Sequence, residues 1–244
     1  MPDKRTHRGA HPDDRRLFSP AAGEVLTRAV GDLSWLLSNG YAMKSSLKLV
    51  GDHLSLTQRQ RMAVMRCACA DGDIVLRHDK RAGADELAGK MLLLDGYNVI
   101  TTVEAALSGG VILCGRDGCY RDLASVHGTY RKVEETIPAV KLIAQVTNQL
   151  GVHGCHWYLD SPVSNSGRLK TLIAQLAEQE QWNWQVELVT SPDGVLARAD
   201  DIVATADSDI LNRCRRWFDL ARAVIAQHVP DAWLIDLGQT EACD

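Results

Sequence analysis

The sequence predicts an α/β fold with a mostly parallel central sheet, preceded by a small all-helical unit. Residues 91–236 alternate short apolar runs with segments whose apolar residues recur at helical spacing, an order that is typical of βαβ units. The apolar runs lack polar alternation, as expected of parallel strands that are buried on both faces. Residues 17–72, in contrast, show only helical spacing.

The front of the chain is predicted to form three helices. The first starts at Ser19-Pro20, where Ser is a good N-cap and Pro fits the first turn, and it ends at Asn39-Gly40. A second short helix is expected over residues 46–50. Thr57 and Gln60 fit a capping box that opens a third helix, which reaches about Ala70. The predicted domains are a flexible arm at 1–16, a basic helical domain at 17–85 and an α/β domain at 88–244, with a polar linker over 79–90.

The back of the chain supplies the strands and helices of the sheet domain. The expected strands are 91–94, 111–114, 156–159, 186–189, 202–205 and 232–235, and the expected helices are 136–150, 167–181 and 208–227. The connection over 98–135 is long and ill-defined, and its pattern allows a partly helical segment around 122–130.

Charge is distributed unevenly along the chain of 244 residues. The formal net charge is -4, but residues 1–90 hold 15 Lys and Arg against 11 Asp and Glu, and residues 91–244 hold 12 against 20. The front is therefore basic and the back acidic, which leaves a nucleic-acid partner open. No apolar run approaches the roughly 20 residues that span a bilayer, and the N-terminus lacks the apolar segment of a secretory signal. Seven cysteines without a regular framework indicate reduced thiols, so we expect a cytoplasmic protein without a membrane partner.

Aspartates follow four of the expected strands. They are Asp95, Asp160, Asp207 and Asp236, and Asp209 lies two residues past Asp207 at a helix start. Because the carboxyl ends of parallel strands meet at one sheet edge, these acids would converge there. Clustered carboxylates raise each other's pKa values or hold a cation, and hard oxygen ligands suit Mg²⁺ or Mn²⁺. A single Asp at a strand end is more often a turn former or helix cap, which is the interpretation we favour for Asp236.

Three segments together resemble the NYN branch of the PIN-like nuclease superfamily. Residues 92–100 (Leu-Leu-Leu-Asp-Gly-Tyr-Asn-Val-Ile) resemble its opening strand and first acid. Residues 157–162 (Trp-Tyr-Leu-Asp-Ser-Pro) resemble its second acidic strand end, and residues 199–210 resemble its third motif. Residues 1–85, through 35–41 and 54–61, resemble the helical front of an uncharacterised bacterial and archaeal family in which a domain of unknown function is joined to a PIN-like back half.

This resemblance implies a three-layer PIN-like domain and a role for each matching residue. The acids Asp95, Asp160 and Asp207 would bind metal and be catalytic, with Asp209 as a fourth ligand or a neighbour of the ligands. Asn98 would position the Asp95 carboxylate or a phosphate oxygen, and Thr205 would hydrogen-bond near the metal. Either Asp200 or Asp201 would match an acidic helix residue of these enzymes. The 101–135 segment departs from the pattern, and its Arg121, Arg131 and Lys132 are candidates for binding substrate.

Other chemistry is weighed against this interpretation. Cys67 and Cys69 with His53 or His78 could suggest zinc, although their spacing is not that of a zinc finger or ribbon. A nucleophile at Cys114 or Cys119 with His127 would lack an orienting third group. Trp182 and Trp184 could stack bases or pack in the core, and the basic cluster Arg213, Arg215 and Arg216 could guide RNA or complement nearby acids.

These observations predict a Mg²⁺- or Mn²⁺-dependent ribonuclease, an endonuclease that hydrolyses RNA phosphodiester bonds. The alternative is a non-catalytic RNA- or ribosome-binding adaptor on a degenerate PIN-like scaffold. A weaker alternative is a phosphatase-like enzyme for small phosphoesters. RNA is the expected partner, and a homodimer is possible on the sequence alone.

Overall fold

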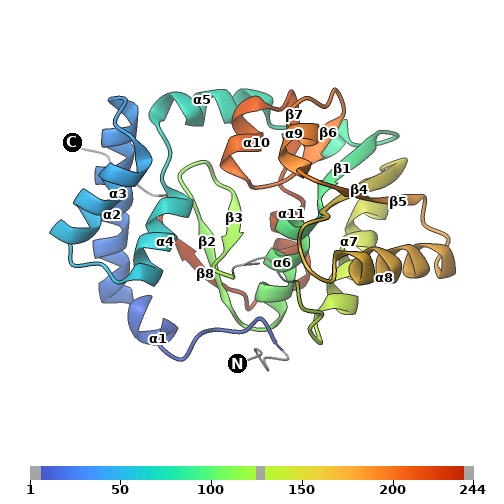
Figure 1. Ribbon diagram of the computed structural model, residues 1–244, viewed down its shortest axis with the longest axis horizontal. Helices are drawn as coiled ribbons and strands as arrows, with labels where there is room; N and C mark the ends of the chain where they lie inside the picture. Colours follow the sequence, from blue (N-terminus) through green and yellow to red (C-terminus); the bar gives the residue numbers. More distant parts are fainter. Residues whose placement is uncertain (1–6, 125–129, 239–244) are drawn as a thin grey trace.

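The centre of the protein is a sheet of five parallel strands (Figure 1). The structure is a computed structural model that describes residues 7–124 and 130–238. The strand order is β5-β4-β1-β6-β7, with all neighbouring pairs parallel. The strands are β1 (Met91–Asp95), β4 (Gly154–Asp160), β5 (Trp184–Val189), β6 (Ile202–Ala204) and β7 (Arg216–Phe218). The α/β class with a helical front is thus confirmed.

Helices cover both faces of this sheet, so that it forms the middle of three layers. One face packs against α6 (Gly96–Leu107), α7 (Thr136–Gln149), α8 (Ser166–Gln179) and α11 (Leu220–His228). The other face packs against two short helices, α9 (Pro192–Leu196) and α10 (Ser208–Arg213). Strand β1 shows why its sequence is apolar throughout, since Leu92 and Leu94 enter the first cluster and Leu93 enters the second.

The expected single helix over 208–227 is wrong. The chain leaves α10 at Arg213, forms β7 as the fifth strand, and only then enters α11. Trp217 lies at the centre of that strand, is 1% exposed and joins the apolar cluster under α9 and α10. Burial of this large side chain against the sheet therefore overrides the local helical pattern.

A second, smaller sheet separates the central sheet from the helical front. Its order is β3 (Tyr120–Asp122), β2 (Val111–Cys114) and β8 (Trp233–Asp236), with β3 antiparallel and β8 parallel to β2. Two expected strands, 111–114 and 232–235, are thus present but do not belong to the central sheet. Asp122, the first residue of the segment 122–130 whose pattern allows a helix, is instead the last residue of β3, and residues 125–129 lie outside the described residues.

Five helices form the front of the molecule. They are α1 (Asp14–Leu17), α2 (Pro20–Ser38), α3 (Met43–His53), α4 (Gln58–Cys67) and α5 (Asp71–Lys80), followed by a 3₁₀ turn, η1 (Ala84–Glu86). The Ser19 cap and the Thr57–Gln60 capping box are present. Helix α5 was not expected; it follows the end of the expected third helix, and its last two residues fall in the expected linker. Apolar residues of α2 and α4 share one buried cluster with those of β2 and β8.

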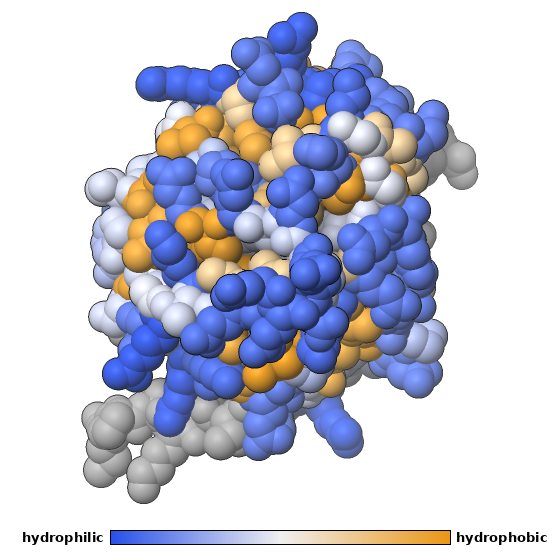
Figure 2. All heavy atoms as spheres, turned by 90° about the vertical axis from the view of Figure 1, so that its right-hand side faces the viewer, coloured by the Kyte–Doolittle hydropathy of each residue, from blue (hydrophilic) through white to orange (hydrophobic). Residues whose placement is uncertain are grey.

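Residues 7–9 of the expected arm lie against the sheet domain. Arg8 pairs with the fully buried carboxylate of Glu104 on α6 and lies over the ring of Tyr130. On the side of β5 and α8, polar residues cover most of the surface and apolar residues lie in separate patches (Figure 2). None of the described helices is long and apolar enough to cross a bilayer. A homodimer stays a prediction.

Candidate active site

The carboxyl ends of β1, β4 and β6 bring a group of aspartates together. Asp95 is the last residue of β1, Asp160 is the last of β4, and Asp207 follows β6 by three residues. Asp95 is only 8% exposed. Burial first, and then the charges of Asp207, Asp193 and Asp160, raise the pKa of Asp95 to about 7. The negative charges of these acids therefore interact, as expected for strand ends that meet at one edge of a sheet. We refer to Asp95, Asp160, Asp193 and Asp207 as the acid group.

Asp193 is a member of this group that the sequence analysis missed. It lies in the first turn of α9, directly after Pro192, where a negative charge suits the helix N-terminus. Burial and the charges of Asp207 and Asp209 raise its pKa. The Pro192-Asp193 pair, which is typical of a helix start, was the available signal.

The two acids that were weighed for a similar role lie elsewhere. Asp200 pairs with Arg215 at 3.1 Å, and its side chain is 91% exposed. Asp201 is exposed as well.

Thr205 and Asn98 organise the loop that follows β6. The Thr205 hydroxyl donates to Asp95 Oδ2 at 2.8 Å and accepts from the backbone N–H of Asp207 at 3.0 Å. Asn98 Oδ1 accepts from the backbone N–H of Ala206 at 2.8 Å. Thr205 thus lies beside the first acid as expected, whereas Asn98 holds the backbone of the loop and not the Asp95 carboxylate.

Asp207 and Asp209 differ in their partners. Asp207 Oδ1 caps α10 by accepting from the backbone N–H groups of Asp209 (2.8 Å) and Ile210 (3.1 Å). Within the described residues its Oδ2 makes no hydrogen bond. Asp209 pairs with Arg213 one turn along the same helix, and its side chain is 68% exposed. One carboxylate oxygen of Asp207 is therefore free to take part in the site, whereas the Asp209 carboxylate is paired with the Arg213 guanidinium.

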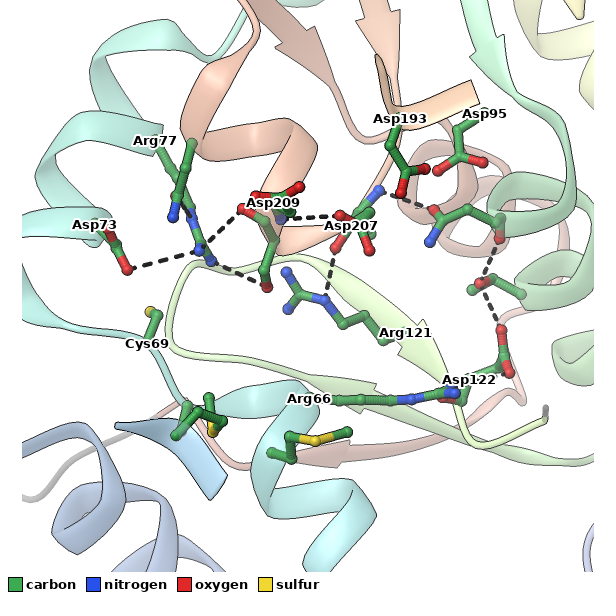
Figure 3. A pocket seen from close by; sticks show the side chains of 18 of the residues that line it. Arg66, Cys69, Asp73, Arg77, Asp95, Arg121, Asp122, Asp193, Asp207 and Asp209 are labelled. Carbon is green, nitrogen blue, oxygen red and sulfur yellow. Dashed lines mark hydrogen bonds and ion pairs between the residues drawn. The ribbon is translucent and has the colours of Figure 1, made fainter. Parts of the chain in front are cut away.

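A cavity of about 860 Å³ lies between these acids and the helical front (Figure 3). The acids Asp95, Asp193, Asp207 and Asp209 line one part of it, and Asp160 lies outside this lining. Its other walls come from the front helices and the β2–β3 sheet, with apolar side chains Leu37, Met43 and Met65 and basic side chains Arg66, Arg77 and Arg121. The cavity thus joins the two regions of opposite net charge.

The basic residues expected to bind substrate either pair with other protein groups or lie outside the cavity lining. Arg121 lines the cavity, but its guanidinium donates to both oxygens of Asp117 and to the Ala206 carbonyl. Arg131 and Lys132 do not line the cavity, and the Arg131 carbonyl accepts from Arg8 at 3.0 Å. Farther along the chain, the Arg213, Arg215 and Arg216 side chains pair with Asp209, Asp200 and Glu86, which matches the interpretation that they complement nearby acids.

The remaining candidates have structural roles. Burial raises the pKa of the Cys69 thiol to about 11 and that of Cys119 well above its usual value, which disfavours the reactive thiolate. Within the described residues six cysteines are free thiols, and His127 lies outside them. Trp182 and Trp184 pack against the main core, with their ring centroids 4.6 Å apart. Asp236 Oδ1 accepts from the Gly238 N–H in a turn, as expected, and lies in the small sheet.

The acid group has the oxygen donors that a hard cation prefers, but its carboxylates are not arranged around a common point. Its donors are carboxylate oxygens, which Mg²⁺ and Mn²⁺ prefer. Over residues 7–124 and 130–238, no three His, Cys, Asp or Glu side chains are arranged around one point as a metal site. A metal site here therefore requires side-chain rotation toward the cavity.

Comparison with known proteins places the chain in a family. Residues 84–223, more than half of the chain, match the family described as "Domain of unknown function (DUF5616)". The protein belongs to this family. The DUF5616 region follows residues 25–80, which match a second family, "Protein of unknown function (DUF434)". Neither description names a nuclease.

One curated relative is similar over most of both chains. It is an uncharacterized protein of Methanocaldococcus jannaschii, MJ0935, which is 29% identical over 186 residues. The match covers 76% of this chain and 88% of the relative. No solved structure matches the chain.

Proposed function

We propose that this protein is a Mg²⁺- or Mn²⁺-dependent ribonuclease that cleaves RNA internally. The observation that supports it best is Asp95, a buried carboxylate whose charged neighbours among the described residues are the acids Asp207, Asp193 and Asp160. Structural carboxylates are normally paired, and strongly raised pKa values cluster at functional sites. The resemblance of residues 92–100, 157–162 and 199–210 to PIN-like nucleases supports the same conclusion.

The proposed ligands are Asp95, Asp160, Asp193 and Asp207. A divalent ion held there would neutralise the carboxylates, bind a phosphodiester oxygen and activate water. Thr205 fixes the orientation of Asp95 through its 2.8 Å hydrogen bond. Asp209 is left outside this set because it pairs with Arg213.

The helical front supplies the opposite side of the cavity and an excess of basic residues. Of the two front arginines that line the cavity, Arg66 is the more exposed, at 26% of its side chain, although it also pairs with Asp122 at 3.4 Å. An RNA strand that enters the cavity would therefore meet this cation on one side and the acids on the other. The basic front offsets the repulsion between the acidic back and a phosphate backbone.

The test is cleavage of single-stranded and structured RNA by purified protein with Mn²⁺. Wild-type protein is expected to cut, and Asp95→Asn to lose the activity. Asp236→Asn is the matched control, because Asp236 also ends a strand but lies in the other sheet. Absence of cleavage by the wild type, or full activity of Asp95→Asn, would overturn the proposal.

A second candidate is a non-catalytic RNA-binding adaptor. The observation that favours it is the geometry of the acids, of which no three described ones surround one point. It predicts RNA binding that weakens with salt and does not respond to Mn²⁺. An Mn²⁺-dependent stabilisation that Asp95→Asn abolishes would exclude it in favour of a preserved site.

A further inference from the structure

A second buried charge cluster connects the helical front to the acid group. Asp117, in the turn between β2 and β3, lies between two guanidinium groups. It pairs with Arg77 of α5 at 2.6 Å and with Arg121 of β3 at 2.7 Å. All three side chains are at most 8% exposed. One carboxylate therefore joins a front helix to the small sheet.

Each arginine of this cluster also holds a part of the acid-bearing segment. Arg121 Nε donates to the Ala206 carbonyl at 2.8 Å, next to Thr205 and Asp207. Arg77 Nε donates to Asn212 Oδ1 at 2.7 Å and a terminal nitrogen donates to the Ser208 carbonyl at 3.3 Å. The loop before α10 and the helix itself are thus fixed from outside the central sheet.

A second residue of α5 strengthens the same connection. Lys80 Nζ donates to the Asn212 carbonyl at 2.7 Å, near the end of α10. Helix α5 therefore contacts both ends of α10: Arg77 reaches Ser208, the first residue of α10, and Arg77 and Lys80 reach Asn212 in its last turn. Since Asp207 is the N-cap of α10, a movement of this helix would move the Asp207 carboxylate.

We infer that Arg77 and Asp117 are positioning residues of the candidate site, through which the helical front sets the placement of Asp207. The inference rests on the proposed function for its catalytic consequence. Its structural part, that α5 holds the segment from Ala206 to Asn212, does not. It also gives a physical reason for the join between the two matched families, because Arg77 lies in one and its partners lie in the other.

Direct phosphate binding by these arginines is disfavoured by their contacts. The Arg77 side chain is 3% exposed and its nitrogens face Asp117, Asn212 and Ser208. A guanidinium committed in this way cannot form the forked contact that phosphate prefers without breaking the cluster. A positioning role and a substrate-binding role for Arg77 therefore predict different experimental results.

The experiment compares Arg77→Lys and Asn212→Ser with the wild type in the full-length protein. Both variants keep the net charge and leave Asp117 paired with Arg121. Amide hydrogen exchange over 206–212 and the salt dependence of RNA binding are measured below the unfolding temperature. The third quantity is the Mn²⁺ concentration that half-saturates the shift of the thermal unfolding transition. Arg215→Lys is the control, since Arg215 pairs with Asp200 on the surface.

The expected result is faster exchange over 206–212 in both variants and Mn²⁺ affinity that is about tenfold or more weaker. The salt dependence of RNA binding should stay unchanged. Unchanged exchange overturns the inference even if the protein cuts RNA. A shallower salt dependence with unchanged Mn²⁺ affinity overturns it in favour of phosphate binding. If wild-type protein cuts no RNA, the proposed function fails, and the exchange measurement still decides whether α5 positions the loop.

Discussion

Two buried carboxylates have opposite charged surroundings: Asp95 lines the cavity among other acids, whereas Asp117 lies behind Arg77 and Arg121, which line it. Asp117 lies between Arg77 and Arg121, and these cations hold its pKa well below the usual range against the effect of burial. Asp95 lies with Asp160, Asp193 and Asp207, and burial with their charges raises its pKa to about 7. The same chain can thus compensate a buried charge fully. At the sheet edge around Asp95 the neighbouring charges are acids instead, which is the pattern expected of a site that needs a cation.

The largest effect on stability is expected for Asp117→Asn. Removing this charge leaves two buried guanidinium groups unpaired, and breaking a buried pair costs about 3–5 kcal/mol. Because the folded pKa of Asp117 lies below its unfolded value, the loss should be present at neutral pH and disappear only under strongly acidic conditions. Urea unfolding measures it. Asp73→Asn is the control, since Asp73 is 3.8 Å from Arg77 and 34% exposed; an equal loss there would refute the comparison.

Asp95→Asn is expected to stabilise the folded protein, in contrast to Asp117→Asn, when a chelator keeps the site free of metal. The folded pKa of Asp95, about 7, lies above its unfolded value of 3.8, so its contribution to stability is full below pH 4 and is lost as pH rises to about 7. At about 1.4 kcal/mol for each pKa unit, Asn should stabilise the protein by ~2–4 kcal/mol at pH 8.

The two proteins should converge as the pH falls to 4. Thermal unfolding across this range is the measurement. A destabilised Asp95→Asn variant at pH 8 would mean that Asp95 is compensated by contacts other than those described.

Mn²⁺ should stabilise the wild-type protein, as Asp95→Asn does in the absence of metal, because both reduce the negative charge of the acid group. A ligand at a hundredfold its dissociation constant stabilises the folded state by about 2.7 kcal/mol. We expect this increase for the wild type and for Asp236→Asn, and none for Asp95→Asn. Calorimetry or thermal unfolding with Mn²⁺ and with chelator gives the answer. The same increase in all three proteins would place the metal elsewhere.

The sequence predicted the acids better than it predicted their surroundings. Strand-end acids are visible because an apolar run fixes where a parallel strand ends, and Asp95 and Asp160 are the last residues of their strands. Asp193 was missed because α9 has five residues, too few for a helical pattern. Asp117 was missed because Arg77 lies 40 residues before it, and only the folded chain brings this arginine to the turn that Asp117 shares with Arg121.

The helical front shows the same limit. Local signals such as the Ser19 cap and the Thr57–Gln60 box were sufficient to place two helix starts. Helix α5 has no side-chain cap, but its acids in the first turn and basic residues in the last turn suit a helix and were an unused signal. The contact of Arg77 and Lys80 with α10 could not be predicted, because no pattern within residues 71–80 encodes it.

The smallest effect on stability is expected for Asp209→Asn, which sharpens the difference between the acids themselves. Asp209 forms an exposed pair with Arg213 one turn away, and such pairs contribute about 0.3–0.5 kcal/mol. We expect its loss to change stability by no more than that and to leave the Mn²⁺ response intact. Asp193→Asn, in the group around Asp95, should abolish the Mn²⁺ response. Metal titration of both variants tests this pair of outcomes. If Asp209→Asn removes the response and Asp193→Asn retains it, the Arg213 pair must open on metal binding, and the ligand set is the one that the resemblance to PIN-like nucleases implied.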